Sequence, residues 1–269
     1  MPGSTRRGVA VFILMAGGAA GQSAASRPSF AEFEVASIKP TPIGTNGRWI
    51  RMLSTNEFAA KNYEIRRLIA AAYNVSPQAI LGGPAWMDSE HYDILARTPG
   101  AVRPNQDEQM AMLRRLLADR FRLSFHREEK EMHVYALTAA RGGAKLKEST
   151  VSPDAAPQGP PPLIFVVYPQ VVKLPARYAT MAEFASVLQR SALESPVVDK
   201  TGLAGRYDFD LEFTPDETLF GGALGNGSGD SVKPGLFAAI QQQLGLKLEA
   251  TKGPVEALII DHVERPSAN

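Results

Sequence analysis

The feature that most constrains this chain is an order of structural elements that occurs twice, once on each side of a proline-rich stretch. Residues 152–162 read SPDAAPQGPPP, which is too poor in apolar side chains to pack and too rich in proline to pair in a sheet. We interpret residues 150–163 as a linker and expect two bodies, residues 26–149 and residues 164–269.

The first body combines amphipathic helices with strand-like runs. Residues 65–73 carry apolar side chains at helical spacing, and Asn62 could cap this helix. A second helix is expected after Asp107, followed by strands at residues 123–126 and 134–139.

The second body has the same order. Thr180 and Glu183 form a capping box ahead of an apolar helix face, and a final helix is expected from Pro234 to a terminating glycine at Gly245. Strand-like runs surround these helices, at residues 196–199, 207–213, 247–249 and 257–263.

Short sequence echoes support a duplication. Tyr92-Asp93 matches Tyr207-Asp208, and the Phe-Arg-Leu run ending at Leu123 matches the Leu-Lys-Leu run ending at Leu248. The sequence therefore predicts an α+β fold of two similar halves, each a small mixed or antiparallel sheet with two helices. In this alignment Tyr92 is equivalent to Tyr207, and Leu123 to Leu248.

The N-terminus has the layout of a secretory signal peptide. Arg6 and Arg7 precede an apolar stretch at residues 8–21, and small residues follow. We predict a signal peptide over residues 1–25, export to the periplasm or the medium, and no stable membrane insertion after its removal, because the stretch is shorter than a membrane span. The paired arginines leave the choice between the general and the twin-arginine export routes open.

Composition excludes several classes of protein. The chain has no cysteine, so it has no disulfide, thiol nucleophile or thiolate metal site. Its 29 basic and 28 acidic residues give a net charge of +1, which argues against a nucleic-acid partner. No cofactor is predicted.

The run Asp199-Lys200-Thr201-Gly202 resembles the phosphorylated-aspartate motif of ion pumps, but Leu203 replaces the threonine that this motif requires. Its Lys-Thr-Gly part also occurs in serine β-lactamases, whose Ser-x-x-Lys nucleophile motif is absent from this chain. We interpret the segment as a turn in which Gly202 and Gly205 supply backbone angles that other residues resist.

Residues 126–133 form the densest polar cluster. On a strand His126 and Glu128 share a face, and with His133 they could bind a metal ion, whereas a charged run between two strands more commonly forms a solvated hairpin tip. Asp261 and His262 could form an acid/base pair, although adjacent strand residues point to opposite faces.

A rigid turn is expected at Gly82, Gly83 and Pro84, directly before Trp86. The tryptophan could fill the core or offer a stacking surface to a sugar or peptide. We treat Trp86, with His126, Glu128 and His133, as candidate binding residues.

Five phrases of the sequence are informative in combination: FEVASIKP from Phe33, GGPAW from Gly82, LLADRF from Leu116, PVVDKTGL from Pro196 and GPVE from Gly253. Together they resemble a soil-associated exported bacterial family known only as domain of unknown function 3738. Such domains also resemble a region fused to membrane metallopeptidases of the β-lactam sensor-transducer type. The resemblance implies an extracytoplasmic sensing or interaction module, but not proteolysis, because the chain has no His-Glu-x-x-His motif.

These observations favour a non-enzymatic extracytoplasmic binding, sensing or interaction module, with a cell-envelope ligand or protein as its partner. The alternative is an extracytoplasmic hydrolase or metal-dependent enzyme that uses the polar residues at 126–133, 261 and 262. A structure that shows whether these side chains converge distinguishes the two hypotheses.

Overall fold

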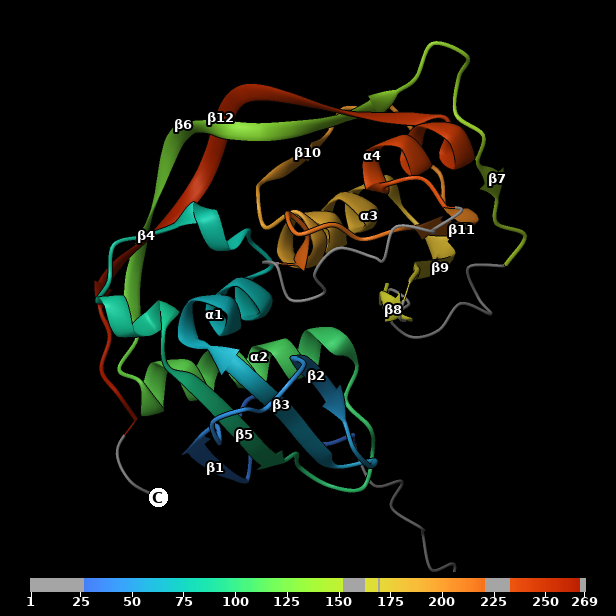
Figure 1. Ribbon diagram of the computed structural model, residues 1–269. Coiled ribbons are helices and arrows are strands. Elements are labelled where there is room, and N and C mark those ends of the chain that lie inside the picture. The colour runs from blue at the N-terminus through green and yellow to red at the C-terminus, as the bar shows by residue number, and fades with distance from the viewer. Residues whose placement is uncertain (1–26, 152–162, 169, 221–232, 267–269) are drawn as a thin grey trace, which may run out of the picture.

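The computed structural model describes residues 27–151, 163–168, 170–220 and 233–266 (Figure 1). It confirms an α+β fold. The signal-peptide prediction and most of the predicted linker lie outside the described residues. Within the described residues, no helix is both long and apolar enough to span a membrane.

The first half is an antiparallel sheet covered by two helices. The sheet order is β1 (Val35–Pro40), β5 (His91–Arg97), β3 (Glu57–Glu64) and β2 (Trp49–Met52). Helices α1 (Ile65–Tyr73) and α2 (Gln106–Arg120) pack against it, as Figure 1 shows. A capping box formed by Asn105 and Glu108 starts α2.

The second half repeats this sheet. Its order is β7 (Lys147–Glu148), β11 (Tyr207–Phe213), β9 (Val172–Ala179) and β8 (Val166–Val167). Each helix here continues as a π-helical turn, so that α3 (Met181–Val187) leads into η4 (Leu188–Ala192) and α4 (Leu236–Ala239) into η6 (Ile240–Leu244). The capping box of Thr180 and Glu183 starts α3, as the sequence predicts.

A third sheet joins the halves by exchanging their last strands. Its order is β10 (Val197–Asp199), β6 (Ser124–Ala139), β12 (Leu246–His262) and β4 (Ile80–Leu81). Strand β6 ends the first half but pairs in parallel with β10 of the second, and β12 ends the second half but pairs in parallel with β4 of the first. Figure 1 shows β6 and β12 running together from one half to the other.

This exchange corrects the expected hairpins. The sequence predicts two short strands at 123–126 and 134–139, with a solvated tip between them. The structure has one continuous strand, β6, paired along its length with β12, which likewise replaces the two strands predicted at 247–249 and 257–263. We call this long β6–β12 pair the ribbon. The charged run is exposed because it lies on the part of the ribbon between the two hydrophobic cores.

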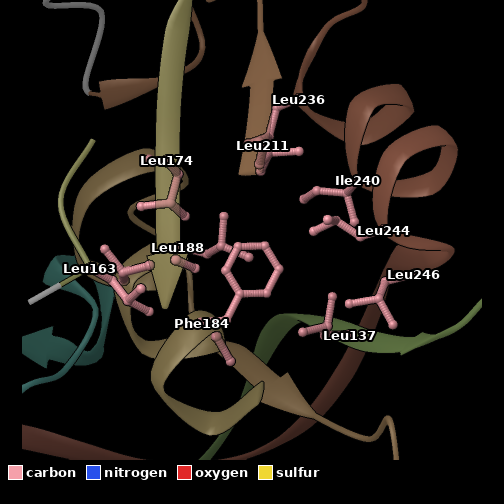
Figure 2. Packing of buried hydrophobic residues seen from close by; sticks show 14 of the residues in the cluster. Leu137, Leu163, Leu174, Phe184, Leu188, Leu211, Leu236, Ile240, Leu244 and Leu246 are labelled. Atoms are coloured by element: carbon pink, nitrogen blue, oxygen red, sulfur yellow. The ribbon is translucent and has the colours of Figure 1, made fainter. Parts of the chain in front are cut away.

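Each core contains a residue from the other half's last strand. Leu258 of β12 is buried in the first core with Phe58, Leu68 and Phe121. Leu137 of β6 is buried in the second core, where Figure 2 shows Phe184 surrounded by leucine and isoleucine side chains. The apolar ends of the ribbon therefore anchor both halves.

The duplication extends to a bulge before the first helix of each half. Asn62 and Tyr178 have left-handed backbones, with φ of 59° and 55°. The backbone N–H of each donates to an aspartate of the neighbouring strand, Asp93 at 2.9 Å and Asp208 at 2.8 Å. Tyr92 and Tyr207, which precede these aspartates, occupy equivalent strand positions.

Two local predictions were wrong. Asn62 does not cap α1, because Glu64 occupies that position and the Asn62 amide donates to the carbonyl of Gly47. Leu123 is not equivalent to Leu248. Tyr135 pairs with Val197 as Leu258 pairs with Ile80, and this correspondence makes Leu123 equivalent to Leu246.

Candidate functional site

The polar residues singled out from the sequence lie on the ribbon and do not converge. Nδ1 of His126 lies 2.8 Å from Oδ1 of Asp261, a residue placed at a register shift in β12. Glu128 pairs with Lys130 at 2.5 Å. His133 lies seven residues along β6 from His126, roughly 23 Å at the rise of an extended strand.

These side chains form few of the arrangements that metal binding or acid/base catalysis requires. Among the described residues there is no group of three or more His, Cys, Asp or Glu side chains that could hold a metal ion. His262 pairs with Glu264 at 2.8 Å, not with the neighbouring Asp261. The His126–Asp261 pair is exposed, and within the described residues no hydroxyl group donates to it.

Trp86 lies in the short 3-10 helix η2 (Ala85–Asp88), packed against the first core. The Arg265 guanidinium stands over its ring, 5.2 Å from the centroid, and is held there by Glu90. One ring face is therefore covered by an ion pair. Gly82 and Gly83 have left-handed backbones, with φ of 76° and 82°, and Pro84 is the residue before η2.

The segment after β10 is a turn. Oδ1 of Asp199 accepts hydrogen bonds from the backbone N–H and the hydroxyl of Thr201, at 2.9 and 2.8 Å. Gly202 has a φ of 71°, but Gly205 does not have a positive φ. What restricts Gly205 is space, because a Cβ atom there would lie 2.9 Å from the Tyr207 hydroxyl.

The two halves also meet directly, at the C-terminal end of α1. The Ser186 hydroxyl donates to the Asn74 side chain at 2.6 Å, and the Gln189 amide donates to the Asn74 carbonyl at 3.1 Å. The Ser76 hydroxyl donates to the Glu194 carbonyl. Polar groups from α1 and from α3 with η4 therefore define a junction between the halves.

An ionic cluster borders this junction. Glu194 of the second half, with a left-handed backbone at φ 56°, pairs with Arg67 and lies 3.6 Å from Arg48. Glu64 lies 3.4 Å from both of these arginines. Two carboxylates and two guanidinium groups are thus mutually paired and largely buried.

A cavity of about 140 Å³ opens at the junction between α1, α2 and α3. Its lining includes both apolar and polar residues. The residues that line it are Ala71, Ala72, Asn74, Gln106, Asp107, Met110, Arg114, Leu163, Glu183, Ser186 and Arg190. None of the binding residues proposed from the sequence is among them.

Arg190 of η4 is the unusual residue in this cavity. Its Nε atom is buried and has no hydrogen-bond partner, and within the described residues no carboxylate pairs with its guanidinium. Burial lowers the pKa of Arg190, an effect that the nearby Tyr63 partly offsets. Arg190 as a whole is half-buried, so its Nη groups, unlike Nε, remain accessible to a molecule in the cavity. An arginine partly removed from water without an ion pair is a candidate for an anionic partner.

The other cations near the cavity are satisfied. Arg114 donates to the Ala72 carbonyl at 2.6 Å and its guanidinium lies 5.9 Å from the Tyr73 ring centroid. Arg206, which pairs with the cavity residue Glu183, also donates to the Tyr178 carbonyl at 2.8 Å. Arg190 therefore stands apart by its environment and not by its residue type.

A second cavity, of about 220 Å³, lies over β8, β9 and β11. Its charged groups are already paired, since Glu212 lies 2.5 Å from Lys173 and 2.8 Å from Lys233. Their hydrogen bonds lower the pKa of Glu212 to about 2. This cavity lacks the unpaired buried group that distinguishes the junction.

The sequence carries no signal for Arg190 as a site residue. It lies beyond the apolar face that Phe184, Val187 and Leu188 form, where a charged residue is ordinary. Only the packing of α1 and α2 against the same surface half-buries its side chain.

Comparison with known proteins identifies a family for this chain, and that family has no described activity. Residues 66–263, more than half of the chain, match the family described as Protein of unknown function (DUF3738). No curated protein and no solved structure matches the chain.

Proposed function

We propose, for a chain that belongs to the DUF3738 family of proteins of unknown function, that it is a non-enzymatic extracytoplasmic binding module. Its ligand site is the cavity at the junction of the two halves. The observation that carries this proposal is Arg190, a cation that lines the cavity with a buried Nε and no partner.

The position of the cavity supports the proposal. Ligand sites form preferentially where two structural units meet, because side chains from both can converge there. Here α1 and α2 contribute Ala71 and Arg114, and α3 with η4 contributes Ser186 and Arg190. A molecule in the cavity contacts both halves.

The extracytoplasmic location rests on sequence. Arg6 and Arg7 before an apolar stretch are typical of an export signal, and the phrases quoted above resemble a soil-associated exported family. The related regions fused to membrane metallopeptidases suggest sensing as the biological use of binding.

Blocking the cavity tests this proposal. Ala71 lines it from α1, and Ala71→Phe fills the space with a ring while keeping a residue that a helix tolerates. The matched control is Ala118→Phe, on the exposed side of α2 and away from the cavity.

Wild type and both variants are screened by thermal shift and saturation-transfer NMR against small molecules, wall fragments, short peptides and sugars. We expect binders of the wild type and of Ala118→Phe that Ala71→Phe no longer recognises. Binders that Ala71→Phe retains in full would place the site elsewhere, and a screen without any binder would contradict a binding function at the junction.

A further inference from the structure

We propose that the junction cavity binds a small organic monocarboxylate whose carboxylate pairs with Arg190. This inference rests on the proposed function and adds the chemical class of the ligand. It follows from four features of the cavity, namely an unpaired cation, the pairing of three nearby glutamates with other groups, the surrounding charges and the volume.

The unpaired cation comes first. A guanidinium presents five N–H donors in a planar fork and cannot lose its charge at neutral pH. Leaving it half-buried without an acceptor is unfavourable, and a carboxylate is the group that matches the fork with two parallel hydrogen bonds. Nε of Arg190 is buried without an acceptor, and within the described residues no hydrogen bond is found for its half-buried Nη groups, which are the donors left for the ligand.

Three glutamates near the cavity are engaged with other groups of the chain. Glu64 and Glu194 pair with Arg48 and Arg67. Glu183 accepts the backbone N–H of Thr180 at 2.8 Å and lies 3.4 Å from Arg206. Asp107 also lines the cavity, but within the described residues no ion pair joins it to Arg190, so the guanidinium is available to the carboxylate of a ligand.

The surrounding charges favour a monoanion. Asp107 and Glu183 also line the cavity, so a second negative charge on the ligand would meet like charges. A phosphate monoester carries about −1.5 to −2 at neutral pH, whereas a carboxylate carries a single charge. The one unpaired cation and the two acidic neighbours match the carboxylate.

The volume limits the rest of the molecule. A cavity of about 150 Å³ holds a benzene-sized molecule, and the junction cavity has about 140 Å³. Ala71, Ala72, Met110 and Leu163 offer apolar contacts beside the polar wall. The ligand is thus of roughly six heavy atoms, with a short aliphatic part, by the same size comparison.

Arg190→Met tests the assignment, because methionine keeps an unbranched side chain and removes the charge. Arg114→Met is the matched control, because Arg114 lines the same cavity but has acceptors of its own. In ligand-free, carboxylate-free buffer we expect Arg190→Met to melt at the wild-type temperature or above, and Arg114→Met to melt below it. A lower melting temperature for Arg190→Met would show that the chain itself satisfies Arg190, and would overturn the inference.

Binding is measured by saturation-transfer NMR and thermal shift with butyrate, with neutral butyramide of the same size, and with inorganic phosphate. We expect the wild type to bind butyrate at least tenfold more tightly than butyramide or phosphate, and Arg190→Met to lose that preference. Equal binding of butyrate by wild type and Arg190→Met, preference for phosphate, or no binding of butyrate would each overturn the carboxylate assignment.

The two proposals fail in different ways. If butyramide binds as well as butyrate and Ala71→Phe abolishes both, the cavity is a binding site but the carboxylate is not its determinant. If Ala71→Phe leaves the binding of every probe unchanged, the proposed function itself fails.

Discussion

At the scale of single residues, one aspartate in each half holds the bulge that precedes the first helix. Asp208 accepts the backbone N–H of Tyr178, and this hydrogen bond holds the pKa of Asp208 below its usual value. Burial raises the pKa of Asp93, but the N–H of Asn62 and the hydroxyl of Thr41 outweigh this effect, so its pKa is also lowered. The repeated Tyr-Asp sequence thus has a structural cause.

These lowered pKa values predict how stability depends on pH. Because each folded-state pKa lies below the unfolded value of about 3.9, the stabilisation is fully present above that value and is lost as the pH falls through the folded pKa. Asp93→Asn and Asp208→Asn keep an acceptor oxygen but lose its charge. We expect each to lower the free energy of unfolding by about 1 kcal/mol at pH 7.

Urea unfolding at pH 7 and near pH 3 measures this effect, with the exposed Asp119→Asn as control. The difference between wild type and each bulge variant should shrink at the lower pH. An equal difference at both pH values would mean that the charge of these aspartates does not stabilise the fold.

At this scale, a residue's role can be predicted from the sequence where that role depends on residues close to it in the chain. The Tyr-Asp echo and the Thr180–Glu183 capping box are local patterns, and both could be found without the structure. The prediction that Asn62 caps α1 was wrong because asparagine, which is common at helix caps, is also common in a left-handed bulge. Arg190 was not identifiable, because its burial depends on helices distant in sequence.

At the scale of elements, the end of the last helix is held by Gly245. Its φ is 64°, and a Cβ atom there would collide with the Gly143 carbonyl oxygen and lie 2.8 Å from the Lys145 nitrogen. The Gly245 carbonyl also accepts the Ala140 N–H at 2.9 Å, which ties the helix end to the turn after β6. Gly202 has a similar φ of 71° but open space around it.

This contrast separates backbone strain from close packing. Gly202→Ala should lower the free energy of unfolding by about 1 kcal/mol, because only the left-handed backbone resists the methyl group. Gly245→Ala should cost at least about 1 kcal/mol more, because a well-packed backbone must also move. Urea denaturation of both variants measures the two values, and equal losses would contradict the close contact at Gly245.

The ribbon shows why the sequence predicts two short strands where the structure has the single strand β6. Residues 126–133 are charged and polar, and a charged run between apolar runs usually forms a loop. Here it stays extended, because every residue from Ser124 to Ala139 has a partner in β12 or lies beside one. Pairing between strands so distant in sequence leaves no local pattern to detect.

At the scale of the whole molecule, strand exchange makes each half depend on the other. Leu258 completes the first core and Leu137 completes the second, and the junction adds the ion pairs of Glu194. The duplication could be inferred from sequence, but the exchange could not, because two independent halves and two exchanged halves have the same order of elements. The central claim is that this exchange forms one cooperative unit, whose junction holds the cavity.

The two tryptophans make this claim directly measurable, because Trp49 in β2 and Trp86 in η2 both report on the first half. Phe184 is fully buried in the second core, and Phe184→Ala should lower the free energy of unfolding by about 3 to 5 kcal/mol. The measurement is the urea midpoint of this variant, followed by tryptophan fluorescence and by far-UV circular dichroism. We predict a single transition in which both midpoints fall together. A fluorescence midpoint that stays at the wild-type value, while circular dichroism shows a separate earlier transition, would contradict the exchange as a coupling of the two halves.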